Sequence, residues 1–200
     1  GPDPLEVQAI GLDWKWLFIY PEQGIATVNE LAFPEDTPVR FRVSSGSVMN
    51  SFFIPRLGSQ IYAMAGMDND VHLIAEEQGV YPGRSTNYSG AGFSEMTFDA
   101  HVGSVEDFEE WVEKVRSSSD TLTFPEEYYD LATPSEDNEV QYFSEITPAL
   151  YERIIKSFLA GGKHAEFVET YGGVVNGHGA GGHGDESESH GESMSAEAAE

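Results

Sequence analysis

The first half of the chain alternates short β-type runs with turn residues, and this pattern constrains the fold more than any other feature. Between residues 5 and 102, apolar-rich runs are separated by glycine, proline and asparagine. Residues 39–43 and 96–102 alternate apolar and polar side chains, so each is expected to bury one face and expose the other. Many short strands with closely spaced turns are typical of an all-β sandwich or barrel.

About nine strands fit this half of the chain. They are predicted at residues 6–10, 14–19, 27–31, 39–43, 51–54, 60–63, 71–75, 84–88 and 96–102. Gly24, Gly46, Gly79 and the pair Pro82-Gly83 supply turns between them. We therefore predict a mainly β fold, with residues 5–102 as its domain.

After residue 103 the apolar spacing changes from that of a strand to that of a helix. Ser104 followed by Asp107 makes a capping-box start, in which each residue's side chain hydrogen-bonds the other's backbone. An apolar stripe then continues as far as Val115. The pattern predicts a helix that begins at Ser104.

A second helix is predicted near residue 150. Thr147 stands at its cap and Pro148 in its first turn, and Gly161-Gly162 ends it. Residues 103–171 are therefore expected to form a helical C-terminal extension that packs against the β domain.

The two ends of the chain have little apolar content. Residues 1–4 look like a linker or protease remnant, and we expect the chain to be a soluble piece of something longer. Residues 172–200 hold eight glycines, three histidines and six acids, and cannot bury enough surface to order themselves, so a disordered acidic Gly/His-rich tail is predicted. The alternative to a merely solvated tail is one that captures copper or zinc loosely through its metal-binding side chains, which are His178, His183, His190 and Met194.

Composition excludes several classes of function. Asp and Glu number 35 against 10 Lys and Arg, for a net charge of −25, and such a field repels nucleic acid. The absence of cysteine excludes disulfides, zinc–thiolate sites and cysteine nucleophiles. No run of about 20 apolar residues is present, so no membrane-spanning helix is expected within the chain.

Three segments, in this order, carry a family resemblance. They are WKWLFIYP at 14–21, SVMNSFFIP at 47–55 and STNYSGAGFSEM at 85–96. Over residues 5–171 the chain resembles subunit II of the haem–copper respiratory oxidases. In the cytochrome c oxidases of that family, a cupredoxin barrel holds two copper ions through a C-x-E-x-C-x3-H-x2-M loop and a distant histidine. The resemblance implies a cupredoxin-like Greek-key barrel or sandwich.

Placed on this pattern, the chain has lost five of six copper ligands. Serines replace the two cysteines, asparagine the glutamate, phenylalanine the loop histidine and asparagine the distant histidine, and only the methionine remains. In the same order these residues are Ser85 and Ser89, Asn87, Phe93, Asn50 and Met96. A binuclear copper centre needs soft thiolates and imidazoles, so no catalytic, cofactor-binding or metal-binding residue is predicted here.

This loss is what the quinol-oxidising branch shows, and the resemblance extends to subunit II of the cytochrome bo-type ubiquinol oxidases. It implies that ubiquinol is oxidised by the complex, with the haems and remaining copper in subunit I, and that this domain plays a structural or assembly role. It further implies two upstream transmembrane helices and a place on the periplasmic face of a Gram-negative inner membrane. Subunit I and other membrane subunits are the expected partners, and the isolated domain is expected to be inactive.

Two other functions stay open at this point. One is a copper-binding electron-transfer domain, with a redesigned site that uses Met96. The other is a stand-alone extracellular binding module on a cupredoxin-like scaffold. A hydrolase is disfavoured, because no serine lies in a nucleophile-elbow context.

A few single residues receive predictions of their own. His101 should face solvent or a partner subunit, whereas His72 could be buried and hydrogen-bonded. Phe53 is expected in the core and part of residues 64–67 in an interface. The aromatic stretch near Trp14 is expected to serve packing or docking.

Overall fold

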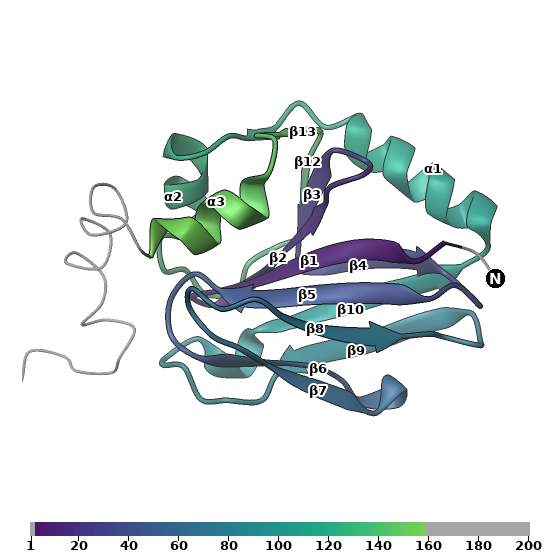
Figure 1. Ribbon diagram of the computed structural model, residues 1–200, viewed down its shortest axis with the longest axis horizontal. Helices are drawn as coiled ribbons and strands as arrows, with labels where there is room; N and C mark the ends of the chain where they lie inside the picture. The colour runs from purple at the N-terminus through teal and green to yellow at the C-terminus, as the bar shows by residue number, and fades with distance from the viewer. Residues whose placement is uncertain (1–2, 159–200) are drawn as a thin grey trace, which may run out of the picture.

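The computed structural model describes residues 3–158, which fold into two stacked β-sheets accompanied by three α-helices (Figure 1). The mainly β class is confirmed. The predictions for residues 159–200, which cover the tail, its histidines and the end of the second helix, lie outside the described residues. Within residues 3–158, no helix is long and apolar enough to cross a membrane.

The first sheet has six strands, of which β1 and β5 are parallel neighbours and the other pairs antiparallel. In spatial order they are β12 (Gln141–Phe143), β3 (Ile25–Val28), β2 (Lys15–Tyr20), β1 (Leu5–Leu12), β5 (Val39–Ser45) and β8 (Asn69–Leu73).

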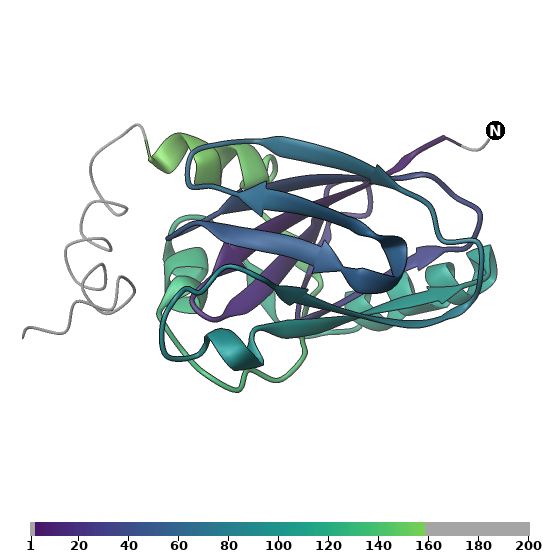
Figure 2. The same cartoon turned by 90° about the horizontal axis from the view of Figure 1, so that it is seen from below.

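The second sheet has five strands, with β4 and β10 parallel. In spatial order they are β4 (Glu30–Pro34), β10 (Thr97–Gly103), β9 (Gly79–Ser85), β6 (Asn50–Ile54) and β7 (Ser59–Ala63). Figure 2 views the same two layers from below.

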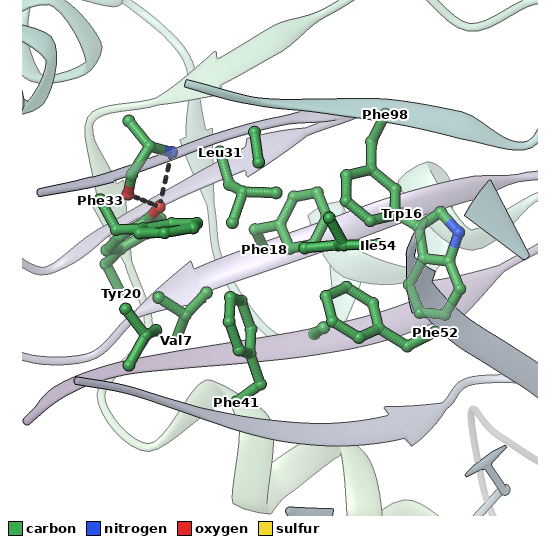
Figure 3. Packing of buried hydrophobic residues seen from close by; sticks show 14 of the residues in the cluster. Val7, Trp16, Phe18, Tyr20, Leu31, Phe33, Phe41, Phe52, Ile54 and Phe98 are labelled. Carbon is green, nitrogen blue, oxygen red and sulfur yellow. Dashed lines mark hydrogen bonds between the residues drawn. The ribbon is translucent and has the colours of Figure 1, made fainter. Parts of the chain in front are cut away.

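Aromatic side chains from both sheets fill the space between them (Figure 3). Phe98 lies edge-on to Phe18 at a centroid distance of 5.1 Å and stacks on Phe52 at 5.3 Å. Trp16 meets Phe52 edge-on at 5.5 Å. Such pairs add about 0.5–1.5 kcal/mol each beyond the burial of their area, so this cluster fixes how the sheets stack.

The C-terminal extension buries the outer face of β1, β2 and β3 in the first sheet. β1 and β2 are almost wholly buried, because a second apolar cluster joins Leu17 and Ile19 to Tyr128, Tyr151 and other residues of the extension. Strand β12 also pairs with β3 and so extends the sheet. The predicted packing of the extension on the β domain is therefore observed.

The first helix of the extension follows its prediction. α1 (Val105–Arg116) begins at Ser104, whose hydroxyl accepts from the Asp107 amide while the Asp107 carboxylate accepts from the Ser104 amide.

The prediction for the start of the second helix was wrong. α3 (Leu150–Ser157) begins after Ala149, which has a φ of 57°, and Thr147 is no cap because its hydroxyl accepts from the Phe124 amide at 2.9 Å. Sequence reasoning also missed α2 (Glu126–Ala132) and three short strands of the extension, which are β11 (Thr121–Leu122), β12 and β13 (Glu145–Ile146).

Two strand predictions need correction. Residues 27–31 are not one strand, because Asn29 takes a φ of 60° and separates β3 from β4. Residues 84–88 are mostly loop, and β9 runs instead through Pro82 and Gly83. Proline fits there because β6 pairs with only the end of β9, and Gly83 leaves room for the Phe98 ring, which a Cβ would approach to 2.0 Å.

Candidate functional site at the loop end of the sandwich

The loops that carry the predicted ligand positions gather at one end of the sandwich, which we call the loop end. It comprises the β1–β2 turn, the loop from β5 to β6 and the loop from β9 to β10, which is residues 86–96. In Figure 1 this end lies at the left, on the same side as α2 and α3.

Asn50 and Ser85 close the loop end with a buried hydrogen bond. The Ser85 hydroxyl donates to Asn50 Oδ1 at 2.9 Å, and Asn50 Nδ2 donates to the Val48 carbonyl at 3.2 Å. Both residues are buried. Gly11 leaves room for the Asn50 side chain, because a Cβ at position 11 would lie only 3.0 Å from Asn50 Nδ2. These two predicted positions are therefore in direct contact.

Ser89 is joined to the rest of the site through Trp14. The indole Nε1 of Trp14 donates to the Ser89 carbonyl at 3.1 Å, and Gly92 lies so close to the indole that a Cβ would approach it to 2.7 Å. Among the described residues, the buried Ser89 hydroxyl has no hydrogen-bond partner. Trp14 thus holds the 86–96 loop in place.

The remaining predicted positions differ in burial. Met96 is fully buried, and its carbonyl accepts from the Ser85 amide at 3.2 Å. Phe93 is half-buried, with its ring edge-on to the exposed Tyr88 at 5.7 Å. Asn87 is also half-buried. Neither Asn87 nor Phe93 is brought into hydrogen-bond contact with the pair Asn50 and Ser85.

The donor groups at this end do not suit copper. Two hydroxyls, two amides and one thioether offer neither a thiolate nor an imidazole, which a binuclear copper centre requires. Within residues 3–158, no group of three or more His, Asp or Glu side chains is placed to hold a metal ion. Of the six positions, Asn50 and Ser85 hydrogen-bond each other and Met96 packs into the core.

Sequence reasoning missed a contact between the extension and the β1–β2 turn. The Ser135 amide donates to the Asp13 carbonyl at 3.0 Å, and the Trp14 amide donates to the Ser135 carbonyl at 3.2 Å. Asn138 Nδ2 donates to the Trp14 carbonyl at 3.3 Å. The turn that presents Trp14 is therefore held by residues more than a hundred positions later, a pairing that no local pattern indicates.

Two buried ionisable groups flank this contact. Lys15 Nζ donates to the Thr133 carbonyl at 2.9 Å and to the Ser135 hydroxyl at 2.6 Å. Burial lowers the pKa of Lys15 to about 8, although the Asp13 charge opposes this. Burial raises the pKa of Asp13 to about 6, and the Ser47 hydroxyl and Lys15 ammonium only partly oppose the rise.

The two histidines within the β domain do not form a site. His101 is 44% exposed and lies 3.7 Å from the Glu30 carboxylate, which Trp111 Nε1 and the Tyr142 hydroxyl also contact. This agrees with the expected outward orientation of His101. The suggestion that His72 could be buried was wrong, because its side chain is 64% exposed beside Asp70 on the edge strand β8.

Alternation along β6 also corrects the prediction for Phe53. Phe52 and Ile54 point into the core, so Phe53 between them lies on the outer side and is only half-buried. Met64 and Met67, which were expected at an interface, are exposed.

Comparisons with known proteins agree with the order of these elements. Residues 23–102 match the family model "Cytochrome C oxidase subunit II, periplasmic domain", and residues 116–162 match "COX Aromatic Rich Motif". The chain is 56% identical over 158 residues to cytochrome bo(3) ubiquinol oxidase subunit 2 of Pseudomonas aeruginosa, which covers 78% of this chain and 46% of the relative. The chain belongs to the ubiquinol oxidase subunit II family.

Further members of the subunit II family are also similar. Ubiquinol oxidase subunit 2 of Acetobacter aceti is 57% identical over 155 residues, which is 78% of this chain and 50% of the relative. Quinol oxidase subunit 2 of Bacillus subtilis is 44% identical over 142 residues, which is 71% of this chain and 44% of the relative. The chain thus spans about half the length of these relatives.

A solved structure supports the fold. The periplasmic domain of subunit II of cytochrome oxidase from Bradyrhizobium japonicum superimposes with a TM-score of 0.54 at 25% identity, covering 56% of this chain and 94% of that one. The cupredoxin-like sandwich expected from the sequence is therefore confirmed.

Proposed function

We propose that this chain is the periplasmic domain of subunit II of a proton-pumping ubiquinol oxidase, with a structural and assembly role beside the haem-bearing subunit I and no copper relay of its own. The observation that carries the proposal is the closure of the loop end by Asn50, Ser85 and Trp14. Neutral hydrogen bonds there occupy the positions at which the family's cytochrome c oxidases bind copper, so electrons would have no conducting centre.

The proposal extends to the rest of the complex. Ubiquinol would be oxidised, and oxygen reduced, at the haems and copper of subunit I, so no cofactor is assigned to this domain. Following the family resemblance, we place two transmembrane helices upstream of Leu5. They would anchor the domain on the periplasmic face of a Gram-negative inner membrane.

The loop end is the surface that we assign to docking on subunit I. Tyr88 at its rim is 78% exposed, and Val48, Thr86 and Asn87 line a shallow pocket beside it. An exposed aromatic side chain next to amide and hydroxyl groups is typical of a protein interface. The net charge of −25 argues against nucleic acid as a partner.

The decisive experiment uses the complete oxidase complex in its membrane. Trp14→Phe and Ser85→Ala should lower the amount of haem-containing complex recovered, while the rate of quinol oxidation per haem stays unchanged in what assembles. Ser94→Ala, at an exposed position of the same loop, is the matched control. A copper relay through this domain would instead lower the rate per haem, and that result would reject the proposal.

A second experiment, on the isolated chain, tests whether these residues correspond to the family's copper-ligand positions. Restoring the donor set with Asn50→His, Ser85→Cys, Asn87→Glu, Ser89→Cys and Phe93→His, with Met96 kept, should produce a coloured protein that binds copper. The unmodified chain should stay colourless when copper is added. A restored set that binds no copper would show that these residues do not correspond to the ligand positions.

A further inference from the structure

Three of the five methionines of the chain lie exposed near the loop end. Met49, Met64 and Met67 are 47%, 41% and 50% exposed. They come from two loops, one between β5 and β6 and the other between β7 and β8. These side chains belong neither to the core nor to the hydrogen bonds that close the loop end, so another role has to account for their position.

The register of β6 and β7 brings the first two together. Asn50 pairs with Ala63, and both are buried, so they point inward. The ladder ends at this pair, and Met49 and Met64 are the next residues beyond it, both exposed. Residues directly opposite each other in an antiparallel pair have Cβ atoms about 4.5–5.5 Å apart. If the register continues by one position, it sets Met49 opposite Met64.

A tight turn brings the third methionine next to them. The Met67 amide donates to the Met64 carbonyl at 3.0 Å, with Gly66 between them at a φ of 73°. The ends of such a turn lie within about 7 Å of each other. The Ser44 hydroxyl also donates to the Met64 carbonyl at 3.1 Å, so the turn is fixed to β5.

These observations assign a chemistry to the cluster. Soft thioethers select Cu(I) over metals that prefer nitrogen and oxygen, and methionine has three rotatable bonds with which to turn its sulfur toward a common centre. We propose that Met49, Met64 and Met67 together bind one Cu(I) ion. This site is distinct from the lost binuclear centre, since it shares none of the six residues.

The surrounding charge favours a cation. The chain carries a net charge of −25, and Asp68 follows Met67 directly. Its carboxylate is held by Arg42 at 2.8 Å and by the Tyr151 hydroxyl at 2.8 Å, so its charge is largely neutralised and it takes no part in the coordination. The site thus combines a soft donor set with the acidic charge of the whole chain.

The test is a competition for Cu(I) under anaerobic conditions. The whole chain is titrated with Cu(I) in the presence of a chromophoric Cu(I) chelator, and the bound ion is examined by X-ray absorption. The unmodified chain should retain one Cu(I) with a shell of sulfur neighbours. Losing a group that merely supports a metal ligand lowers affinity roughly 10- to 100-fold, so each of Met49→Leu, Met64→Leu and Met67→Leu should weaken binding by at least about tenfold.

Two controls separate this site from the tail. Met194→Leu, and a combined His178→Asn, His183→Asn and His190→Asn variant, should both retain Cu(I). Equal retention by the parent and the triple leucine variant, a nitrogen shell, or loss of binding in the histidine variant would each overturn the proposal. If the unmodified chain binds no Cu(I), the proposed site is refuted, and protein docking is the role that remains for the three methionines. Because the readout is copper on this chain, its failure is distinct from a failure of the assembly role.

Discussion

The middle of the sandwich and its loop end are held together by opposite kinds of contact. In the middle, Phe18, Phe52 and Phe98 pack ring against ring. At the loop end, Asn50 and Ser85 are equally buried but are joined by hydrogen bonds. The middle could therefore fold in the same way with or without a metal nearby, whereas the loop end buries polar groups whose contacts depend on their chemistry.

This contrast explains how a cupredoxin-like scaffold would tolerate the replacement of copper ligands that the proposed function implies. Burial of aromatic area contributes several kcal/mol per side chain, while a neutral hydrogen bond contributes only about 0.5–1.5 kcal/mol net. Stability is therefore concentrated in the middle, and the loop end can change its chemistry at a smaller cost in stability. The predictions that follow test this ranking.

The largest loss is expected from Phe98→Ala. This ring contacts Trp16, Phe18 and Phe52 and covers Gly83, so its removal should lower the free energy of unfolding by about 3–5 kcal/mol in urea denaturation. Phe53→Ala, at a half-buried position on the outer side of β6, should cost much less. Equal losses in the two variants would contradict the assignment of the inward face.

The next effect depends on pH and arises at the β1–β2 turn. In the folded state the pKa of Asp13 is about 6, compared with 3.8 for an ordinary aspartate, so Asp13 keeps its proton up to about pH 6. The folded state therefore binds more protons between these pH values, and stability should fall as the pH rises from about 4 to about 6. Since one pKa unit corresponds to about 1.4 kcal/mol, the loss should amount to at most about 3 kcal/mol.

Asp13→Asn checks this effect because it keeps the shape of the side chain and removes the titration. Unfolding free energies measured from pH 4 to 7 should lose most of their downward slope, and above pH 6 the variant should be more stable than the parent. Asp130→Asn makes the same change at an exposed position and should leave the slope in place. An unaltered slope in Asp13→Asn would assign the pH dependence to other groups.

The sequence predicted the sandwich well because its periodic strands follow from local alternation. The capping box at Ser104 was predictable for the same reason, since its two partners are three residues apart. Pro82-Gly83 was misinterpreted as a turn because proline is permitted in a strand with one paired edge, and that edge is a property of the sheet.

The candidate site was predictable only in part. Its loop positions came from the spacing of a family pattern, which says nothing about what the replaced side chains contact. The Asn50 and Ser85 pair and the contact between Ser135 and the β1–β2 turn join residues 35 and 122 positions apart. Such pairs are set by how the sheets and the extension pack, so no local rule could have found them.

A moderate loss is expected from Trp14→Phe, which keeps an aromatic ring near Gly92 but removes the donor to the Ser89 carbonyl. A buried acceptor left without its partner costs about 1–3 kcal/mol, and the smaller ring adds a cavity. Amide hydrogen exchange should accelerate across residues 86–96 while β1 and β2 stay protected. Uniform acceleration over the whole sandwich would mean that Trp14 belongs to the middle and not to the loop end.

The smallest of these losses is expected from Ser85→Ala, because no ring volume is removed. Asn50 Oδ1 loses its donor at 2.9 Å, and the Ser51 amide loses a weak acceptor at 3.5 Å. The cost should be about 1–2 kcal/mol, against almost none for the exposed Ser94→Ala. Combining Ser85→Ala with Phe98→Ala tests whether the two regions are independent, because independent contacts should have additive costs. A strong departure from additivity in the double variant would show that the loop end and the aromatic middle stabilise one another.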